Sequence, residues 1–148
     1  MTTTDFTLTL TTERTPQEVF KSVTKVRDWW TGFYSEEIEG STEKPGDEFV
    51  FRAGPGLHYS RQKLVEVIPG KKLVWLVTDS ELTFLEDKQE WTGTRLIFDN
   101  TGKGRITELV FTHEGLNPDI ECFDACAPAW AQYLRNKLLP LINTGEVQ

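Results

Sequence analysis

The 148-residue sequence has few of the features that mark membrane, nucleic-acid-binding or secreted proteins. None of its apolar runs approaches the roughly 20 residues of a membrane-spanning helix, so we expect no membrane insertion. It has no run of five Lys and Arg, and 16 basic against 23 acidic residues give a net charge of -7, which repels a phosphate backbone. We therefore expect no nucleic-acid partner. The start, MTTTD, lacks the charge and apolar run of a signal peptide, which favours a cytoplasmic location.

Cysteine and histidine are equally scarce, with two of each in the chain. Cys122 and Cys126 are four residues apart on a predicted helix, a spacing that places both on one face without suiting a disulfide, so we expect reduced thiols. With His58 and His113 they could supply four zinc ligands, but the paired spacings typical of zinc sites are missing. We expect no metal site and no cofactor, since phosphate-binding glycine loops and the usual hydrolase and protease motifs are missing too.

Aromatic side chains, in contrast, are abundant: nine Phe, five Trp and three Tyr make up 11% of the chain. Each large ring contributes about 3 kcal/mol when it is fully buried. The length and the 38% hydrophobic content suit one globular domain. Because no linker or repeat interrupts the chain, we predict a single domain over residues 1–148 with a core rich in rings.

The N-terminal part predicts a strand followed by two short helices. Apolar and polar residues alternate over 5–11, which indicates a half-buried strand. Thr15 is a typical N-cap, because proline follows it directly and glutamate stands three residues later. The helix that begins there ends near Lys25, and a shorter helical segment carries Trp29 and Trp30.

The central part predicts an antiparallel meander. Pro-Gly and Gly-x-Gly turn signals separate short runs that are rich in β-branched and aromatic residues. The connections are too short for a parallel crossover, so neighbouring strands run antiparallel. The predicted strands are 47–53, 58–68, 72–80, 94–100 and 105–113, and the segment 81–93 is left unassigned.

The C-terminal part predicts one long helix. Asn117 is a suitable N-cap before a proline, and the helix should run to about Asn143, with Gly145 as its stop. Pro128 removes a backbone hydrogen bond and predicts a bend. Lys137 falls inside the broad apolar arc of this helix, where it either extends its ammonium past the core to water or contacts a cavity.

Taken together, several segments resemble the START-like SRPBCC superfamily, and more closely its bacterial group named for homology to the activator of heat-shock protein 90 ATPase. The resemblance rests on 15–20 (TPQEVF), Trp29-Trp30, 45–49 (PGDEF), 74–80 (VWLVTDS), 90–94 (EWTGT) and 111–116 (FTHEGL). It implies an α+β helix-grip fold, in which a curved six- or seven-stranded antiparallel sheet, two short helices and a long C-terminal helix enclose a hydrophobic cavity. It also implies binding of lipids, aromatic compounds or other apolar small molecules.

A curved sheet wrapped on one helix leaves space between the two, and this space is the candidate site. The residues expected to border it are aromatic side chains and a few polar ones on the last helix and strand ends: Trp29, Trp30, Phe33, Trp75, Phe84, Trp91, His113, Cys126, Trp130, Tyr133 and Lys137. No catalytic residue is assigned, because no nucleophile and base are paired in the sequence.

Three functions remain open. The first is non-enzymatic binding of a small hydrophobic, aromatic or lipid-like molecule, and we favour it. The second is a cyclase-like or hydrolase-like enzyme in which His113 works with Glu90 or Asp79 as general acid or base. The third is a stress-response protein with a chaperone partner, which only the name of the related group suggests.

Overall fold

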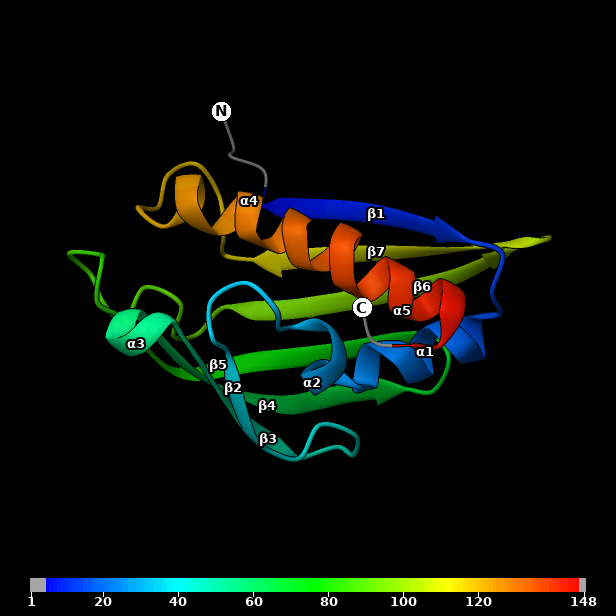
Figure 1. Ribbon diagram of the computed structural model, residues 1–148, viewed down its shortest axis with the longest axis horizontal. Helices are drawn as coiled ribbons and strands as arrows, with labels where there is room; N and C mark the ends of the chain where they lie inside the picture. The colour runs from blue at the N-terminus through cyan, green and yellow to red at the C-terminus, as the bar shows by residue number, and fades with distance from the viewer. Residues whose placement is uncertain (1–4, 147–148) are drawn as a thin grey trace.

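A single antiparallel sheet of seven strands, in the order β1-β7-β6-β5-β4-β3-β2, forms the body of the protein. The computed structural model describes residues 5–146. The sheet is curved, and the C-terminal helix crosses its inner face (Figure 1). The strands are β1 Phe6–Thr12, β2 Glu37–Gly40, β3 Glu48–Ala53, β4 His58–Ile68, β5 Lys72–Leu82, β6 Arg95–Lys103 and β7 Ile106–Glu114.

Helical segments connect and cover the strands. They are α1 Pro16–Thr24, α2 Val26–Trp29, α3 Gly54–Leu57, α4 Phe123–Tyr133, the π-helical turn η1 Leu134–Leu138 and α5 Leu139–Thr144. The start of α1 is as predicted, because the Thr15 hydroxyl accepts a hydrogen bond from the Glu18 N–H at 3.2 Å. The α+β helix-grip prediction is confirmed.

All of the predicted strands are present in the structure. The burial of β7 alternates over its length, whereas the central strand β5 buries three successive residues, Leu73, Val74 and Trp75. Two elements were not predicted from the sequence. They are β2, a four-residue edge strand with exposed glutamates, and α3, where the sequence indicates only a turn. Of the unassigned segment 81–93, the first two residues continue β5, and the rest forms a series of turns before β6.

The predicted start of the C-terminal helix at Asn117 is wrong. The Asn117 side chain accepts from the Asp119 N–H and makes a local turn instead. The helix begins only at Phe123, where the Glu90 carboxylate accepts from the N–H groups of Glu121 and Cys122 at 3.1 and 2.8 Å. The Glu90 side chain therefore provides acceptors for the free backbone N–H groups that precede the helix.

The helix continues through Pro128 and departs from α-helical bonding later, in η1. There the Leu139 N–H bonds to the Leu134 carbonyl, and Pro140 follows without an N–H of its own. The irregular turn therefore lies one turn before the second proline rather than at the first. The stop at Gly145 is confirmed, with a φ of 75°.

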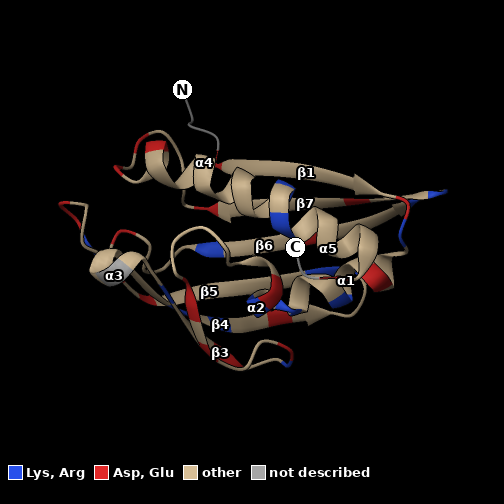
Figure 2. Ribbon diagram, viewed as in Figure 1, with Lys and Arg blue, Asp and Glu red and all other residues tan. Residues whose placement is uncertain are grey.

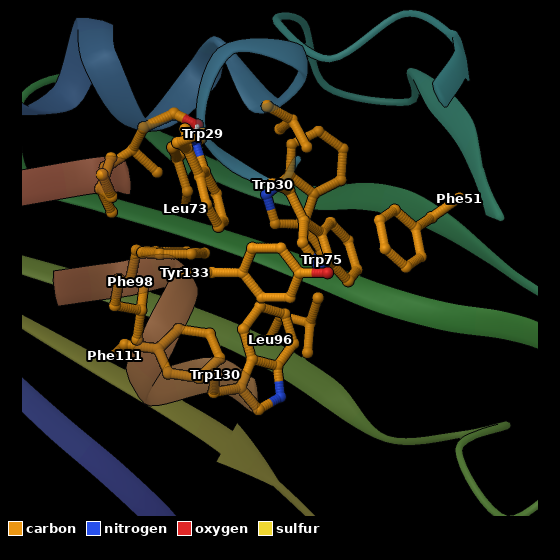
Figure 3. Close-up of a cluster of buried hydrophobic side chains, with 14 of the residues drawn as sticks. Trp29, Trp30, Phe51, Leu73, Trp75, Leu96, Phe98, Phe111, Trp130 and Tyr133 are labelled. Atoms are coloured by element: carbon orange, nitrogen blue, oxygen red, sulfur yellow. Dashed lines mark hydrogen bonds between the residues drawn. The ribbon is translucent and has the colours of Figure 1, made fainter. Parts of the chain in front are cut away.

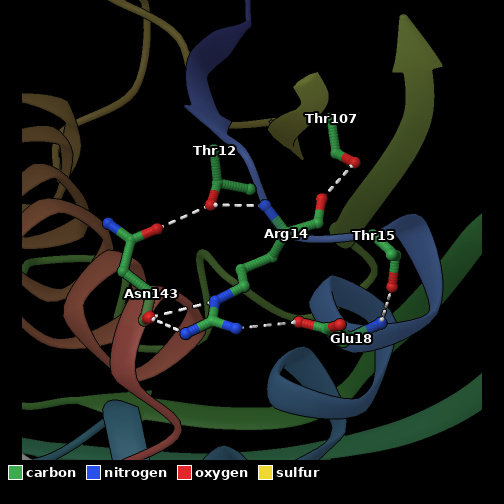
Figure 4. A network of polar contacts seen from close by, with 6 residues as sticks. All are labelled: Thr12, Arg14, Thr15, Glu18, Thr107 and Asn143. Carbon is green, nitrogen blue, oxygen red and sulfur yellow. Dashed lines mark hydrogen bonds and ion pairs between the residues drawn. The ribbon is translucent and has the colours of Figure 1, made fainter. Parts of the chain in front are cut away.

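The end of α5 is attached to the junction between β1 and α1 by a polar network (Figure 4). Arg14 donates from Nε and Nη2 to the Asn143 carbonyl at 3.0 and 2.6 Å. The Thr12 hydroxyl donates to Oδ1 of the same asparagine at 2.6 Å. A guanidinium at a helix C-terminus also suits the helix dipole, so this contact fixes the far end of the helix on the sheet.

The core lies between the sheet and this helix, and large rings dominate it, among them Trp29, Trp75, Trp130 and Phe111 (Figure 3). The ribbon of α4, which covers this core, carries no charged residue except an acidic one near its start (Figure 2). Over the described range, no helix has the length and apolar character needed to cross a membrane.

Candidate functional site

A cavity of 220 Å³ opens where α4 faces β3, α3 and the start of β4. Tyr34, Leu57 and Phe84 are about half exposed and form its mouth. None of the described residues that line it carries a charge. The lining consists of Trp30, Tyr34, Phe51, Ala53, Gly54, Leu57, His58, Phe84, Trp91, Ala125, Cys126, Ala129, Trp130 and Tyr133.

Flat aromatic faces form the inner wall of the cavity. The Trp30 ring stacks on Phe51 with centroids 3.9 Å apart and lies 4.9 Å from Trp130. Trp130 is in turn nearly parallel to Trp91, at 6.0 Å. Small residues of α4, Ala125 and Ala129, leave room opposite these rings. Such a wall favours a planar, apolar guest.

His113 is sealed behind this wall. It is 0% exposed, and its Nδ1 accepts a hydrogen bond from the Trp130 indole at 3.0 Å. Nε2 therefore carries the hydrogen and donates to the Thr94 hydroxyl at 2.9 Å, which itself donates to the Trp91 carbonyl. Burial, and to a smaller extent His58, lower the pKa of His113 to about 3. The ring is a neutral structural bridge.

Glu90 and Asp79, the carboxylates considered as partners of His113, accept hydrogen bonds from other groups. Glu90 accepts from the backbone N–H of Cys122 before α4, and Asp79 accepts from the Ser80 N–H at 3.0 Å. Because both His113 nitrogens bond to Trp130 and Thr94, neither contacts a carboxylate. General acid-base catalysis needs such a contact or an approach to substrate, so the geometry gives no support to His113 as a catalytic group.

His58 differs from His113 because it faces the cavity. Its ring lies edge-on to Phe51 and Trp91, at centroid distances of 5.0 and 4.7 Å. Its Nε2 is 3.1 Å from the Ser60 hydroxyl. Burial lowers the pKa of His58 to about 3, so the ring is neutral at physiological pH.

The loop between α2 and β2 is held over the cavity by one carboxylate. Glu36 accepts hydrogen bonds from the N–H groups of Gly32, Phe33 and Tyr34, at 3.0 to 3.3 Å. It also accepts from the Tyr133 hydroxyl of α4 at 2.6 Å. Burial would raise the pKa of Glu36, but these hydrogen bonds outweigh it and lower the pKa. Burial and the same carboxylate raise the pKa of Tyr133.

Comparison with known proteins agrees with this architecture. The family model described as "Activator of Hsp90 ATPase homolog 1-like protein" matches residues 13–141. The chain belongs to this family. No functionally curated protein matches the sequence.

Several solved structures share the fold at low sequence identity. The Aha1 dimer from Colwellia psychrerythraea is 21% identical with a TM-score of 0.73, covering 96% of this chain and 98% of that one. The AHSA1 protein from Silicibacter pomeroyi is 18% identical with a TM-score of 0.65, covering 93% and 97%. CalU16 from Micromonospora echinospora is 14% identical with a TM-score of 0.62, covering 95% and 76%.

In the present protein, six of the eleven predicted site residues line the cavity: Trp30, Phe84, Trp91, Cys126, Trp130 and Tyr133. Two others, Trp29 and Trp75, fill the core farther along the sheet. Trp29 donates to the Val23 carbonyl at 3.1 Å, and Trp75 packs edge-on against Phe49.

The remaining three predicted residues lie around the cavity but outside its lining. His113 is behind the wall, and Phe33 lies on the outside of the 31–36 loop, 38% exposed. The Lys137 ammonium is 5.2 Å from the centroid of the Phe33 ring, in a cation-π contact. Lys137 therefore packs against the loop, and the structure does not place its charge in the cavity wall.

The structure brings the sulfur atoms of Cys122 and Cys126 together at the start of α4, one helical turn apart, with their Cα atoms 5.6 Å apart. The expectation of two reduced thiols stays a prediction. The Trp91 indole donates to the Cys122 sulfur at 3.4 Å. Among residues 5–146, no group of three or more potential metal ligands comes together.

Sequence reasoning missed the parts of the site that come from β3, α3 and β4. Phe51 and Ala53 are two residues apart on β3, and His58 and Ser60 on β4, so period-two alternation could have placed each pair on the inner face. The sequence indicated His58 as a possible zinc ligand and did not place it at the cavity. The small lining residues Ala125 and Ala129 gave no chemical signal at all.

Proposed function

We propose that this protein binds a small, uncharged, hydrophobic molecule with an aromatic ring, and that it does so without catalysis. The observation that carries the proposal is the open cavity of 220 Å³ with stacked indole and phenyl rings and no charge among its described lining residues. An apolar cavity of about 150 Å³ already accommodates benzene, so this one has room for two fused rings. The sealed His113 removes the support for an enzymatic role.

Calorimetric titration with naphthalene as the probe tests the proposal. We expect saturable binding to the unmodified protein. Ala129→Phe should abolish binding, because Ala129 lines the cavity and a phenyl group there occupies the space of the probe. Ala131→Phe is the matched control, since Ala131 lies on the same helix and outside the lining.

Two results would count against binding in this cavity. One is the lack of any saturable heat with the unmodified protein. The other is equal affinity of the Ala129→Phe and Ala131→Phe variants. Thermal unfolding of both variants shows whether each retains its fold.

A further inference from the structure

A ladder of polar side chains leads from the cavity into the core along β4. His58, Ser60 and Gln62 alternate on the inner face of this strand. Gln62 Nε2 donates to the Ser60 hydroxyl at 2.5 Å, and the hydroxyl is 3.1 Å from His58 Nε2. Ser60 and Gln62 are both 0% exposed, so water does not replace these bonds.

The hydrogens of this ladder can be assigned from donor and acceptor chemistry. The Ser60 oxygen accepts from Gln62, and its own single hydrogen has His58 Nε2 as its acceptor. With the Gln62 amide oriented so that Nε2 faces Ser60, the alternative in which His58 Nε2 donates to Ser60 leaves the buried serine hydrogen without an acceptor. Nε2 is therefore unprotonated, and the hydrogen of the neutral ring is on Nδ1.

The Nδ1–H group reaches accessible space at the cavity. His58 lines the cavity, and its Nδ1 takes part in none of the hydrogen bonds among the described residues. Within the same range, the fully buried side-chain N and O atoms without a partner are Gln62 Oε1 and Asn100 Oδ1. Nδ1 of His58 is not one of them, so it is open to a guest.

The other polar groups of the wall differ in what they offer to a guest. The hydroxyls of Tyr34 and Tyr133 donate their hydrogens to Gln132 and Glu36, so only their oxygen atoms, which accept, are left for a guest. The indole of Trp30, whose N–H has no acceptor among the described residues, can only donate. The donors that the described wall offers to a guest are thus the Trp30 indole and the His58 ring, and no cation in the described lining balances an anion.

We propose that His58 is the specificity-determining residue of the cavity, and that its Nδ1–H donates a hydrogen bond to an uncharged acceptor, such as a ketone oxygen, on an aromatic ligand. This inference rests on the proposed binding function and names the class of ligand. Ser60 is a positioning residue, because its hydroxyl fixes which ring nitrogen of His58 carries the hydrogen.

A first test needs no ligand. The chain has only two histidines, and long-range ¹H–¹⁵N spectra of the imidazole rings distinguish their tautomers. We expect opposite tautomers at pH 7: Nδ1–H for His58 and Nε2–H for His113. An Nε2–H signature for His58 would overturn the inference and leave the proposed function standing. Ser60→Ala should produce a mixture of tautomers at His58 alone.

A second test compares three naphthalenes of similar shape by calorimetry: 2-acetylnaphthalene, 2-isopropenylnaphthalene and 2-naphthoate. The ketone should bind the unmodified protein about tenfold more tightly than the hydrocarbon, because the hydrocarbon leaves the His58 donor unsatisfied. The carboxylate should bind most weakly, since it leaves water without gaining a cation.

Two variants complete the second test. His58→Phe keeps a ring beside Phe51 and Trp91 but has no donor, so the ketone should lose its advantage over the hydrocarbon. Ser60→Ala should reduce the advantage to about threefold. Equal affinities of ketone and hydrocarbon in the unmodified protein, unchanged in both variants, would refute the inference alone. If none of the three probes binds, the proposed function fails with it. Should His58→Phe fail to fold, Ser60→Ala and the tautomer spectra decide.

Discussion

At the scale of single residues, two indole N–H groups have acceptors of very different strength. Trp130 donates to the buried His113 Nδ1 at 3.0 Å, whereas Trp91 donates to the Cys122 sulfur at 3.4 Å. Sulfur is a weak acceptor, and an imidazole nitrogen is a strong one. The two tryptophans are otherwise comparable, because both are buried and both line the cavity.

Replacing each tryptophan by phenylalanine should therefore destabilise the protein unequally. Trp130→Phe leaves His113 Nδ1 buried without a donor, and Trp91→Phe leaves only a sulfur. We expect Trp130→Phe to lower the free energy of unfolding by about 1–2 kcal/mol more than Trp91→Phe does. Urea unfolding at pH 7 measures both changes, and equal losses would show that the bond to His113 contributes no net stability.

The sequence could predict that the chain contains a ring-lined site, but not which rings line it. Trp29 and Trp30 are adjacent and have identical side chains, yet one fills the core and the other forms the cavity wall. The hydrogen-bond partners of His113 come from residues 17 and 19 positions away, on different elements. No local pattern carries such contacts, which is why the sealed state of His113 could not be predicted.

At the scale of elements, the 31–36 loop is positioned by Glu36 instead of by regular secondary structure. Its carboxylate binds three backbone amides of the loop and the Tyr133 hydroxyl of α4. The loop supplies Tyr34 to the cavity mouth, so the order of the loop determines the shape of the opening. The loop is also held by a hydrogen bond from the Gly54 N–H to the Tyr34 carbonyl at 2.6 Å and by the contact of Lys137 with Phe33.

Glu36→Gln should loosen this loop without unfolding the domain. An amide oxygen accepts more weakly than a carboxylate, and the second carboxylate oxygen is lost as an acceptor. We expect amide hydrogen exchange at Gly32, Phe33 and Tyr34 to become about tenfold faster. The control is Glu37→Gln at the exposed start of β2. Unchanged exchange in the Glu36→Gln variant would mean that other contacts order the loop.

The same carboxylate gives a pH dependence with a defined sign. The pKa of Glu36 in the folded protein lies below its ordinary value of 4.5. Its contribution to stability is therefore fully present above about pH 4.5 and is lost as the pH falls through the lower folded value. The melting temperature of the unmodified protein should exceed that of Glu36→Gln at pH 6, and the difference should shrink below pH 4. A difference that grows on acidification would contradict this assignment.

Element boundaries were predictable where the signal is local. Thr15 caps α1 with its own side chain, and that start was found from sequence. The start of α4 depends on Glu90, a residue more than 30 positions away, and the local Asn117-Pro118 pattern was misleading. The first strand showed period-two alternation, and turn signals bounded the five long central strands, but β2 is short, exposed and acidic and has neither signal.

At the scale of the whole molecule, the fold places both of its histidines in apolar surroundings. His58 and His113 lie on different strands, β4 and β7, and meet around Trp91, whose ring is 4.7 Å from each of theirs. Their pKa values fall to about 3, against 6.5 for the free side chain. The unfolded chain therefore binds protons below pH 6.5 that the folded chain excludes.

The free energy of unfolding should consequently be highest above pH 6.5 and should fall as the pH decreases from 6.5 toward 3. In this range the histidines of the unfolded chain take up protons and those of the folded chain do not, so protonation favours the unfolded state. At pH 5 each histidine should account for a loss of about 2 kcal/mol relative to pH 7. Urea unfolding at pH 7, 6 and 5 measures this loss, and His58→Phe should show about half of it. A free energy of unfolding that stays constant over this range would mean that both rings titrate normally in the folded protein. In that case the neutral donor assigned to His58 would become an imidazolium in mild acid, and carboxylate guests would then bind more tightly as the pH falls.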